Sequence, residues 1–133
     1  MKYSAFFSSL AAIVWLSAGC CTMRTAENFE GVPVDGRQEA LCTLEVENTG
    51  WFLFYVVPLI CGNPQYPNAN DWRFFKNTVT VENNVNAVKK EMERRGTTRV
   101  ANLYSRTKDE PFFMVLYKRE CHTSAVLLKD RVK

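Results

Sequence analysis

Histidine is almost missing from this chain of 133 residues, in which His122 is the only one. Histidine is the usual proton carrier near neutral pH and the commonest metal ligand, so its scarcity argues against most acid–base, zinc and haem sites. The chain also lacks an excess of one charge, since 17 Lys and Arg residues stand against 14 Asp and Glu residues. A nucleic-acid-binding domain would carry a basic face or stripe. We therefore expect no nucleic-acid partner.

Loops that mark catalysis or phosphate binding are lacking as well. Gly62 is followed by Asn63 and Pro64, and not by the lysine and helix start of a phosphate-binding loop. Ser105 and Ser124 lack the sequence context of a nucleophile elbow. We predict that the protein is not an enzyme, with no catalytic residue and no cofactor.

The N-terminal apolar run is too short for a membrane-spanning helix, which needs ~20 apolar residues. It covers residues 5–16, follows the single charge of Lys2, and leads into the small residues 17–19. This order of charge, apolar core and small residues is typical of a signal peptide. We predict that residues 1–19 are a signal peptide that is removed on export. The signal is predicted to be removed by lipoprotein processing, for the reason given in the next paragraph. The alternatives are cleavage by an ordinary signal peptidase, with simple secretion, and an uncleaved anchor.

The junction at residues 16–20, Leu-Ser-Ala-Gly-Cys, resembles the lipobox of bacterial lipoproteins. The resemblance implies that Cys20 is the lipidated first residue of the mature chain. It departs from the family pattern in that Leu16 lies four residues before the cysteine and Ser17 occupies the position three before it. Two or more acyl chains anchor a protein stably. Because Cys21 is not aspartate, the resemblance further implies the periplasmic face of the outer membrane in a Gram-negative host.

Residues 20–40 contain Gly31, Pro33 and Gly36 and show no sustained periodicity, so we predict a lipid-anchored tether there. Residues 41–133 then form a single small domain. Its predicted strands cover residues 41–47, 51–57, 99–105 and 112–117, and residues 123–128 either continue the last of these or form a further strand. Turns are predicted at 48–50 and 108–111 and a loop at 61–71. The predicted fold class is α+β, an antiparallel-rich sheet of about four strands with one amphipathic helix on one face. The expected order is strand, strand, helix, strand, strand.

The helix is predicted from an apolar stripe with spacings of four, three and four residues. The stripe consists of Val81, Val85, Val88 and Met92. Thr80 is the predicted N-cap and Gly96 ends the helix.

The runs 51–57 and 112–117 are apolar on both faces, so both are predicted as central strands. One helix covers only one face of such a sheet, and the other face must meet the aromatic loop, a second copy or another protein. The candidate interaction patch consists of Trp51, Phe54, Trp72 and Phe74.

Lipidation would leave four of the five cysteines, and export would place them in an oxidising compartment. Cys42, Cys61 and Cys121 are candidates for one disulfide, and together with His122 they are candidates for a metal site. Small buried thiols without any partner are the alternative. Cys121 and His122 are neighbours on a predicted strand, so their side chains point to opposite faces and cannot form a nucleophile–base pair. The spacing of these residues does not by itself predict a metal site.

Three segments resemble a group of small uncharacterised bacterial lipoproteins: residues 50–54, 58–63 and 124–129, with the sequences GWFLF, PLICGN and SAVLLK. The resemblance covers most of residues 41–129 and implies a small α+β domain, but it implies no activity. The sequence therefore predicts a membrane-anchored envelope lipoprotein with a non-enzymatic binding, structural or assembly role. Its expected partners are the membrane, a second copy or another envelope protein. The alternative hypothesis is a thiol-based metal or redox sensor in the periplasm.

Overall fold

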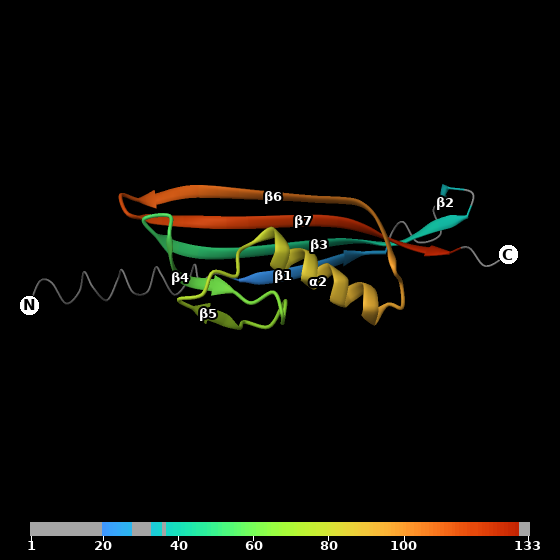
Figure 1. Ribbon diagram of the computed structural model, residues 1–133, viewed down its shortest axis with the longest axis horizontal. Coiled ribbons are helices and arrows are strands. Elements are labelled where there is room, and N and C mark those ends of the chain that lie inside the picture. Colours follow the sequence, from blue (N-terminus) through green and yellow to red (C-terminus); the bar gives the residue numbers. More distant parts are fainter. Residues whose placement is uncertain (1–19, 28–32, 36, 131–133) are drawn as a thin grey trace, which may run out of the picture.

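The computed structural model describes residues 20–27, 33–35 and 37–130, so the predicted signal peptide lies outside the described residues. Its elements are β1 (Cys21–Ala26), β2 (Pro33–Asp35), β3 (Gln38–Leu53), β4 (Val57–Gly62), β5 (Trp72–Phe74), α2 (Val81–Arg94), β6 (Arg99–Phe113) and β7 (Leu116–Asp130). The long strand β3 organises them, because it pairs with β1, β2, β4 and β7. Its 16 residues span about 53 Å at ~3.3 Å per residue, and Figure 1 shows it running along most of the molecule.

The strands form one sheet of order β5-β4-β3-β7-β6, in which every pair is antiparallel. β1 and β4 lie end to end on the same edge of β3, since β1 pairs with residues 43–48 and β4 with residues 50–53. The predicted α+β class and antiparallel sheet are confirmed. The predicted strand number and order are wrong, because the described residues form seven strands, of which five precede α2.

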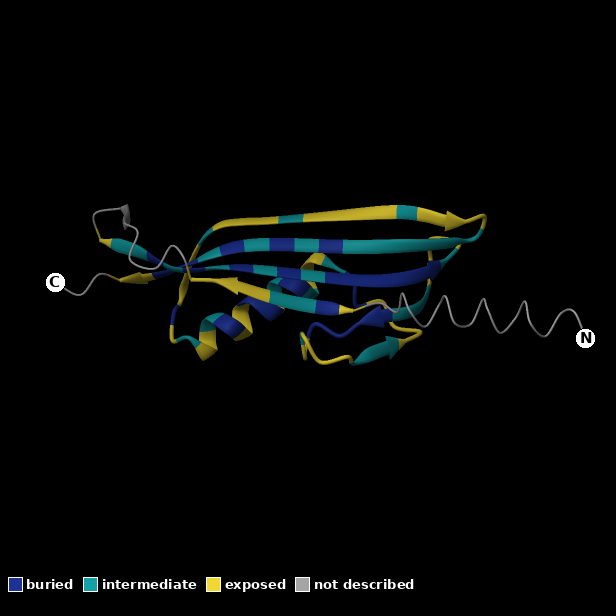
Figure 2. Ribbon diagram, turned by 180° about the vertical axis from the view of Figure 1, so that it is seen from behind, coloured by how far each residue is buried: buried dark blue, intermediate teal, exposed yellow. Residues whose placement is uncertain are grey.

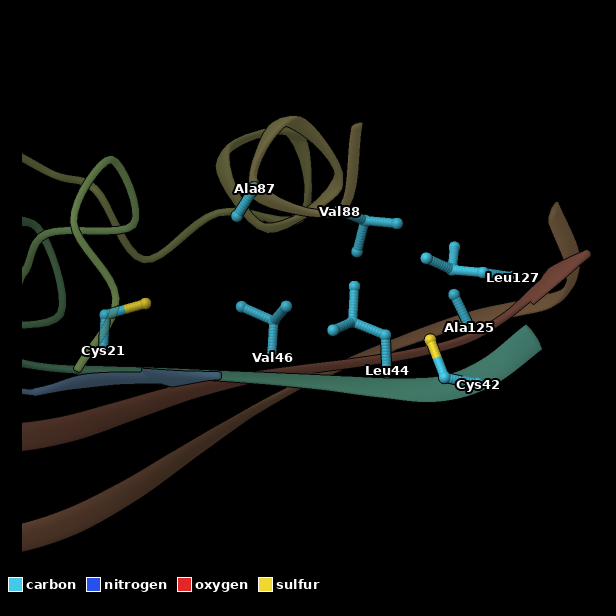
Figure 3. Packing of buried hydrophobic residues seen from close by; sticks show 8 residues of the cluster. All are labelled: Cys21, Cys42, Leu44, Val46, Ala87, Val88, Ala125 and Leu127. Carbon is cyan, nitrogen blue, oxygen red and sulfur yellow. The ribbon is translucent and has the colours of Figure 1, made fainter. Parts of the chain in front are cut away.

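Alternation of apolar and polar residues gives β3 and β7 their two different faces. One face carries Leu44 and Val46 of β3 and Leu127 of β7, none of them exposed. Figure 3 shows Ala87 and Val88 of α2 packed above this face, with the side chains of the cluster between helix and sheet. Most of the hydrophobic core therefore lies between α2 and the β3–β7 pair.

The ends of α2 are those that the sequence predicts. The Thr80 hydroxyl accepts a hydrogen bond from the backbone N–H of Asn83 at 3.2 Å and so caps the first turn. Gly96 has a φ of +66°, which suits glycine and ends the helix.

The buried side of α2 keeps part of the predicted stripe, since Val88 is buried in the core and Met92 packs against it, but it also includes residues outside the stripe. Val81 is exposed, whereas Asn84, Ala87, Val88 and Glu91 are buried. The two polar residues can be buried because the Asn84 amide donates to backbone carbonyls of the sheet and the Glu91 carboxylate accepts from two arginines. Polar partners therefore rotate the helix relative to the position that its valines alone would favour.

A second, smaller core lies between the sheet and the segment before α2. Phe52, Cys61, Val79 and Cys121 pack together there and are at most 2 % exposed. A side chain at Gly50 would place its Cβ within 2.8 Å of Cys61 and Val79, so the absence of one makes room for this core. Residues 48–50, predicted as a turn, thus lie inside β3.

The two runs predicted as central strands are hairpins instead. Residues 51–57 cross from β3 to β4 through residues 54–56, and residues 112–117 cross from β6 to β7 through residues 114–115. The predicted turn at 108–111 lies inside β6. Both predictions are wrong because the register of the long β3–β7 and β6–β7 ladders, and not local composition, decides where the chain reverses.

The segment predicted as a tether contains sheet strands. Residues 21–26 form β1, with a six-residue register that pairs Cys21 with Asn48 and Ala26 with Thr43. Residues 38–40 already belong to β3 and pair with β7. The boundary predicted at residue 41 is therefore wrong, and Cys20 is followed directly by the sheet.

The face of β3 and β7 opposite α2 is polar rather than apolar. Glu45 and Glu47 lie on it with Glu120 and His122, and all four are half-buried. His122 Nε2 lies 2.5 Å from Glu45 Oε1. The apolar surface expected on this face is concentrated instead at one end of the sheet. Figure 2 shows that the edge strand β6 is exposed along most of its length.

Candidate functional site

Cys20 is fixed to β3 by backbone contacts. Its N–H donates to the Thr49 hydroxyl at 2.9 Å, and the Thr49 N–H donates to the Cys20 carbonyl at 2.9 Å. The Cys20 thiol lies 3.9 Å from the same hydroxyl and is on an exposed residue. A group attached to this sulfur would therefore be held at a defined place on the domain.

Gly62 of β4 allows the chain to pass at this place. A Cβ on Gly62 would lie 2.5 Å from the Cys20 carbonyl carbon, 2.6 Å from the Cys21 nitrogen and 2.5 Å from Asn48 Oδ1. Real Cβ atoms do not approach backbone so closely, so only glycine lets β4 end against the start of β1. Trp72 of β5 pairs with the same glycine. The first residue of the described chain is thus packed against β4 as well as β3.

The other four thiols are buried. Burial raises the pKa of Cys21 to about 12, with smaller contributions from the neighbouring thiols of Cys20 and Cys121. Burial also raises the pKa of Cys61 and of Cys121. A thiol with a raised pKa stays protonated at neutral pH, and a protonated thiol is a poor nucleophile and a poor metal ligand.

The structure does not bring the candidate metal and disulfide residues together. Cys42 pairs with Leu127 and Cys121 with Asn48, which is six residues along β3 and about 20 Å away. Cys61 is two strands from Cys121, or about 9.5 Å, beyond the ~7 Å limit between the Cα atoms of a disulfide. His122 points to the opposite face, toward Glu45. Among the described residues, no three potential ligands are grouped for a metal ion.

The four residues of the predicted interaction patch lie in different environments. Trp51 is only 5 % exposed and packs edge-on against Phe112, with ring centroids 5.1 Å apart. Trp72 is half-buried, whereas Phe54 and Phe74 are each more than half exposed. Of the four, only the two phenylalanines are therefore largely exposed to solvent.

A larger apolar surface lies around them at the end of the sheet. Nine of the fourteen exposed large hydrophobic residues of the described chain belong to three segments of this end. We call them the apolar end: Phe54, Tyr55, Val56 and Val57 at the β3–β4 turn, Phe74 and Phe75 at β5, and Phe112, Phe113 and Met114 at the β6–β7 turn. Exposed apolar clusters of this kind mark contact surfaces. Their exposure could not be predicted from the sequence, because an uninterrupted apolar run favours a buried strand and not a turn.

The turn between β3 and β4 has an unfavourable backbone for its residues. Phe54 and Tyr55 have φ values of +50° and +63°, and the Val56 N–H donates to the Leu53 carbonyl at 3.1 Å. Two consecutive residues with positive φ make a type I′ turn, which favours Asn-Gly. An aromatic residue there costs about 1 kcal/mol or more. The Tyr55 ring stacks on Tyr117, which recovers part of that cost.

Charged groups behind the apolar end are paired with one another. Arg119 donates to both carboxylate oxygens of Asp109, at 2.6 and 2.9 Å, and this lowers the pKa of Asp109. Lys118 binds Glu120 at 2.5 Å. The Lys108 ammonium binds Glu110 and lowers its pKa. The carboxylates nearest the apolar end are therefore neutralised by adjacent cations.

Comparison with known proteins does not place the chain in a group. No family model matches it, and neither a curated protein nor a solved structure matches it. No helix among the described residues is both long and apolar enough to cross a bilayer.

Proposed function

We propose that this chain is a lipid-anchored protein of the bacterial envelope, attached through Cys20, whose domain acts by binding and not by catalysis. The observation that carries the proposal is the position of Cys20. It follows residues 16–19 of the lipobox-like junction, it is exposed, and it directly precedes β1. A modifying enzyme acting on the folded domain would reach this thiol and not the other four, which are buried.

The choice of binding over catalysis rests on the position of the chain's single histidine. His122 is held by Glu45 on the polar face, whereas Cys121 is buried on the face that α2 covers. A nucleophile and its base must lie within hydrogen-bond reach, and these two side chains do not. The polar face and the apolar end both offer surfaces for a partner. We favour a structural or assembly role at the membrane over a thiol-based sensor, because the sensor needs thiols that are accessible and close together.

Intact mass of the protein taken from membranes of its host tests the anchor. We expect a mature chain that begins at Cys20 and carries the mass of a diacylglyceryl group, with or without a further acyl chain. Cys20→Ser should abolish that added mass and lower the share of the protein that stays in the membrane fraction. Cys21→Ser is the matched control, since it changes the neighbouring thiol and should leave the modification in place. A chain that begins at residue 20 without lipid would contradict the proposal.

A further inference from the structure

We propose that the apolar end docks on the bilayer that holds the lipid of Cys20, so that a phospholipid surface covers these nine side chains. The inference rests on the lipid anchoring proposed above and adds a second, non-covalent contact with the membrane. It also assigns an orientation to the domain, with the turns between β3 and β4 and between β6 and β7 directed toward the lipid.

The first argument is position. The two turns, β5 and the start of β1 all lie at the same end of the sheet, while β2 and the end of β7 lie at the opposite end (Figure 1). Cys20 lies beside Thr49, about 17 Å along β3 from Phe54 at ~3.3 Å per residue. Phe74 pairs with Ile60 and therefore lies between these two levels. A domain whose strands are tilted to the membrane would place the anchor, β5 and both turns on one surface.

The second argument is the short connection between anchor and domain. β1 begins at Cys21, directly after the anchoring residue, and the Cys20 backbone is hydrogen-bonded to Thr49. An anchored domain without a spacer stays within a few residues' reach of the lipid, so its effective concentration at the surface is high. Under these conditions a modest apolar contact is enough to hold the end at the membrane.

The third argument is the chemistry of the exposed side chains. Five of the nine are phenylalanines, and the turn between β3 and β4 keeps Phe54 and Tyr55 despite a backbone that favours Asn-Gly. Strain retained at an exposed turn points to a role for the side chains themselves. Aromatic residues are favoured at the headgroup level of membranes. Arg73 and Lys76 flank Phe74 and Phe75, where they can meet lipid phosphates.

Depth-dependent quenching tests the docking. The lipidated full-length mature protein is reconstituted into phosphatidylglycerol and phosphatidylethanolamine vesicles with bromine on the acyl chains, and its tryptophan fluorescence is compared with that in unbrominated vesicles. Met114→Trp places a reporter in the β6–β7 turn, and Leu103→Trp is the matched control on β6. Leu103 is also exposed but lies about 33 Å from Phe113 along the strand. The signal of the natural tryptophans is subtracted with the wild-type protein.

We expect brominated lipid to quench the turn reporter of Met114→Trp about twofold or more and to leave the strand reporter of Leu103→Trp unchanged, because only the first would lie at the acyl boundary. Equal quenching of both reporters, or no quenching of the turn reporter, would overturn the docking. A third outcome is a blue shift of the turn reporter's emission without quenching, in a protein that sediments as a dimer. This result would show that a second copy covers the apolar end, and it would also overturn the docking on the bilayer. Mass analysis of the same samples separates these outcomes from a failure of anchoring, since unlipidated protein would refute the proposed function instead.

Phe54→Gly provides an independent test in which stability and membrane contact change in opposite directions. Glycine adopts the positive φ of this position without strain and keeps the N–H that bonds to the Val115 carbonyl at 2.8 Å. In the Cys20→Ser background, the variant should unfold at the same or higher denaturant concentration yet bind vesicles several-fold more weakly. Leu103→Ser, the control, should leave vesicle binding unchanged. Unchanged vesicle binding by Phe54→Gly would contradict the inference.

Discussion

Asn84 of α2 donates its side-chain amide to the carbonyl oxygen of Cys121 on β7, at 2.8 Å, in a fully buried position. The same amide nitrogen lies 3.3 Å from the Val46 carbonyl of β3. One helical side chain therefore joins the two central strands from above. Its own carbonyl oxygen is buried and has no partner among the protein atoms that the structure describes, so the two donor bonds are what stabilise the asparagine there.

We expect Asn84→Ala to lower the free energy of unfolding by about 2 kcal/mol, because two buried carbonyls lose their donor and a small cavity opens. Chemical denaturation followed by circular dichroism measures the change. Asn86→Ala is the control, since Asn86 lies exposed on the same helix and should change stability by no more than about 0.5 kcal/mol. Equal effects of the two variants would show that the contact with β7 does not stabilise the fold.

Glu91 should make the fold sensitive to acid. Its carboxylate accepts hydrogen bonds from Arg94 and Arg95, and these lower its pKa from 4.5 to about 2. A depressed pKa contributes stability that is complete above the unfolded-state value and is lost as the pH falls from about 4.5 through 2. Because Arg94 is largely exposed, we expect about 1 to 2 kcal/mol.

To test this prediction, the free energy of unfolding is measured as a function of pH for the wild type, for Glu91→Gln and for the control Glu93→Gln. The deficit of Glu91→Gln should be constant above pH 4.5 and should shrink below it, whereas Glu93→Gln should follow the wild type. A deficit that does not change between neutral and strongly acidic pH would mean that packing, and not charge, accounts for Glu91.

Gly62→Ala should loosen the attachment of β1. The added carbon would lie 2.5 Å from the Cys20 backbone and from Asn48 Oδ1, so the strands must separate, at an expected cost of about 2 to 3 kcal/mol. Hydrogen exchange should show faster exchange of the β1 amides. Gly96→Ala is a matched substitution for which no described atom lies within 4 Å of the added carbon, so it should show only the cost of a positive φ, about 1 kcal/mol. Unchanged protection of β1 in Gly62→Ala would contradict the close contact.

Thiol titration tests the arrangement of the cysteines. In Cys20→Ser, we expect almost no reaction with a soluble thiol reagent at pH 8 while the protein is folded, because Cys21, Cys42, Cys61 and Cys121 are buried. Four thiols should react once the chain is unfolded without reductant. A count of two after unfolding would reveal a disulfide, and two of these cysteines would then have to lie closer together than the strand pairing described above allows.

Capping explains why the ends of the helix could be predicted from the sequence whereas most of the strand boundaries could not. The signals at Thr80 and Gly96 are local, since each depends on a hydroxyl or a missing side chain within one turn. The strand ends depend on pairing between distant segments. Asn48 and Gly50 favour a turn by composition, yet they lie inside β3, because the Asn48 amide donates to the Thr78 carbonyl and Gly50 makes room for Val79.

The candidate site also contains residues that local sequence patterns predict and residues that only strand pairing reveals. The sequence points to Cys20 because the lipobox resemblance is a local pattern, and it includes Phe54 and Phe74 because they are aromatic. It places Phe113 and Met114 in a buried strand, since an uninterrupted apolar run at residues 112–117 has no turn residue to show that the chain reverses. Only the β6–β7 register, which pairs Phe113 with Leu116, reveals that these side chains project from the end of the molecule.

The length of β3 has a mechanical consequence. If Cys20 carries the lipid, no flexible spacer separates the anchor from β1. The 16-residue strand β3 and its long neighbours would then extend from the membrane as one rigid unit. This unit would hold β2 and the C-terminal end of β7 up to about 50 Å from the membrane surface. A partner that binds this far end would do so at a fixed distance from the membrane surface, so the length of β3 would set the spacing between the membrane and the partner.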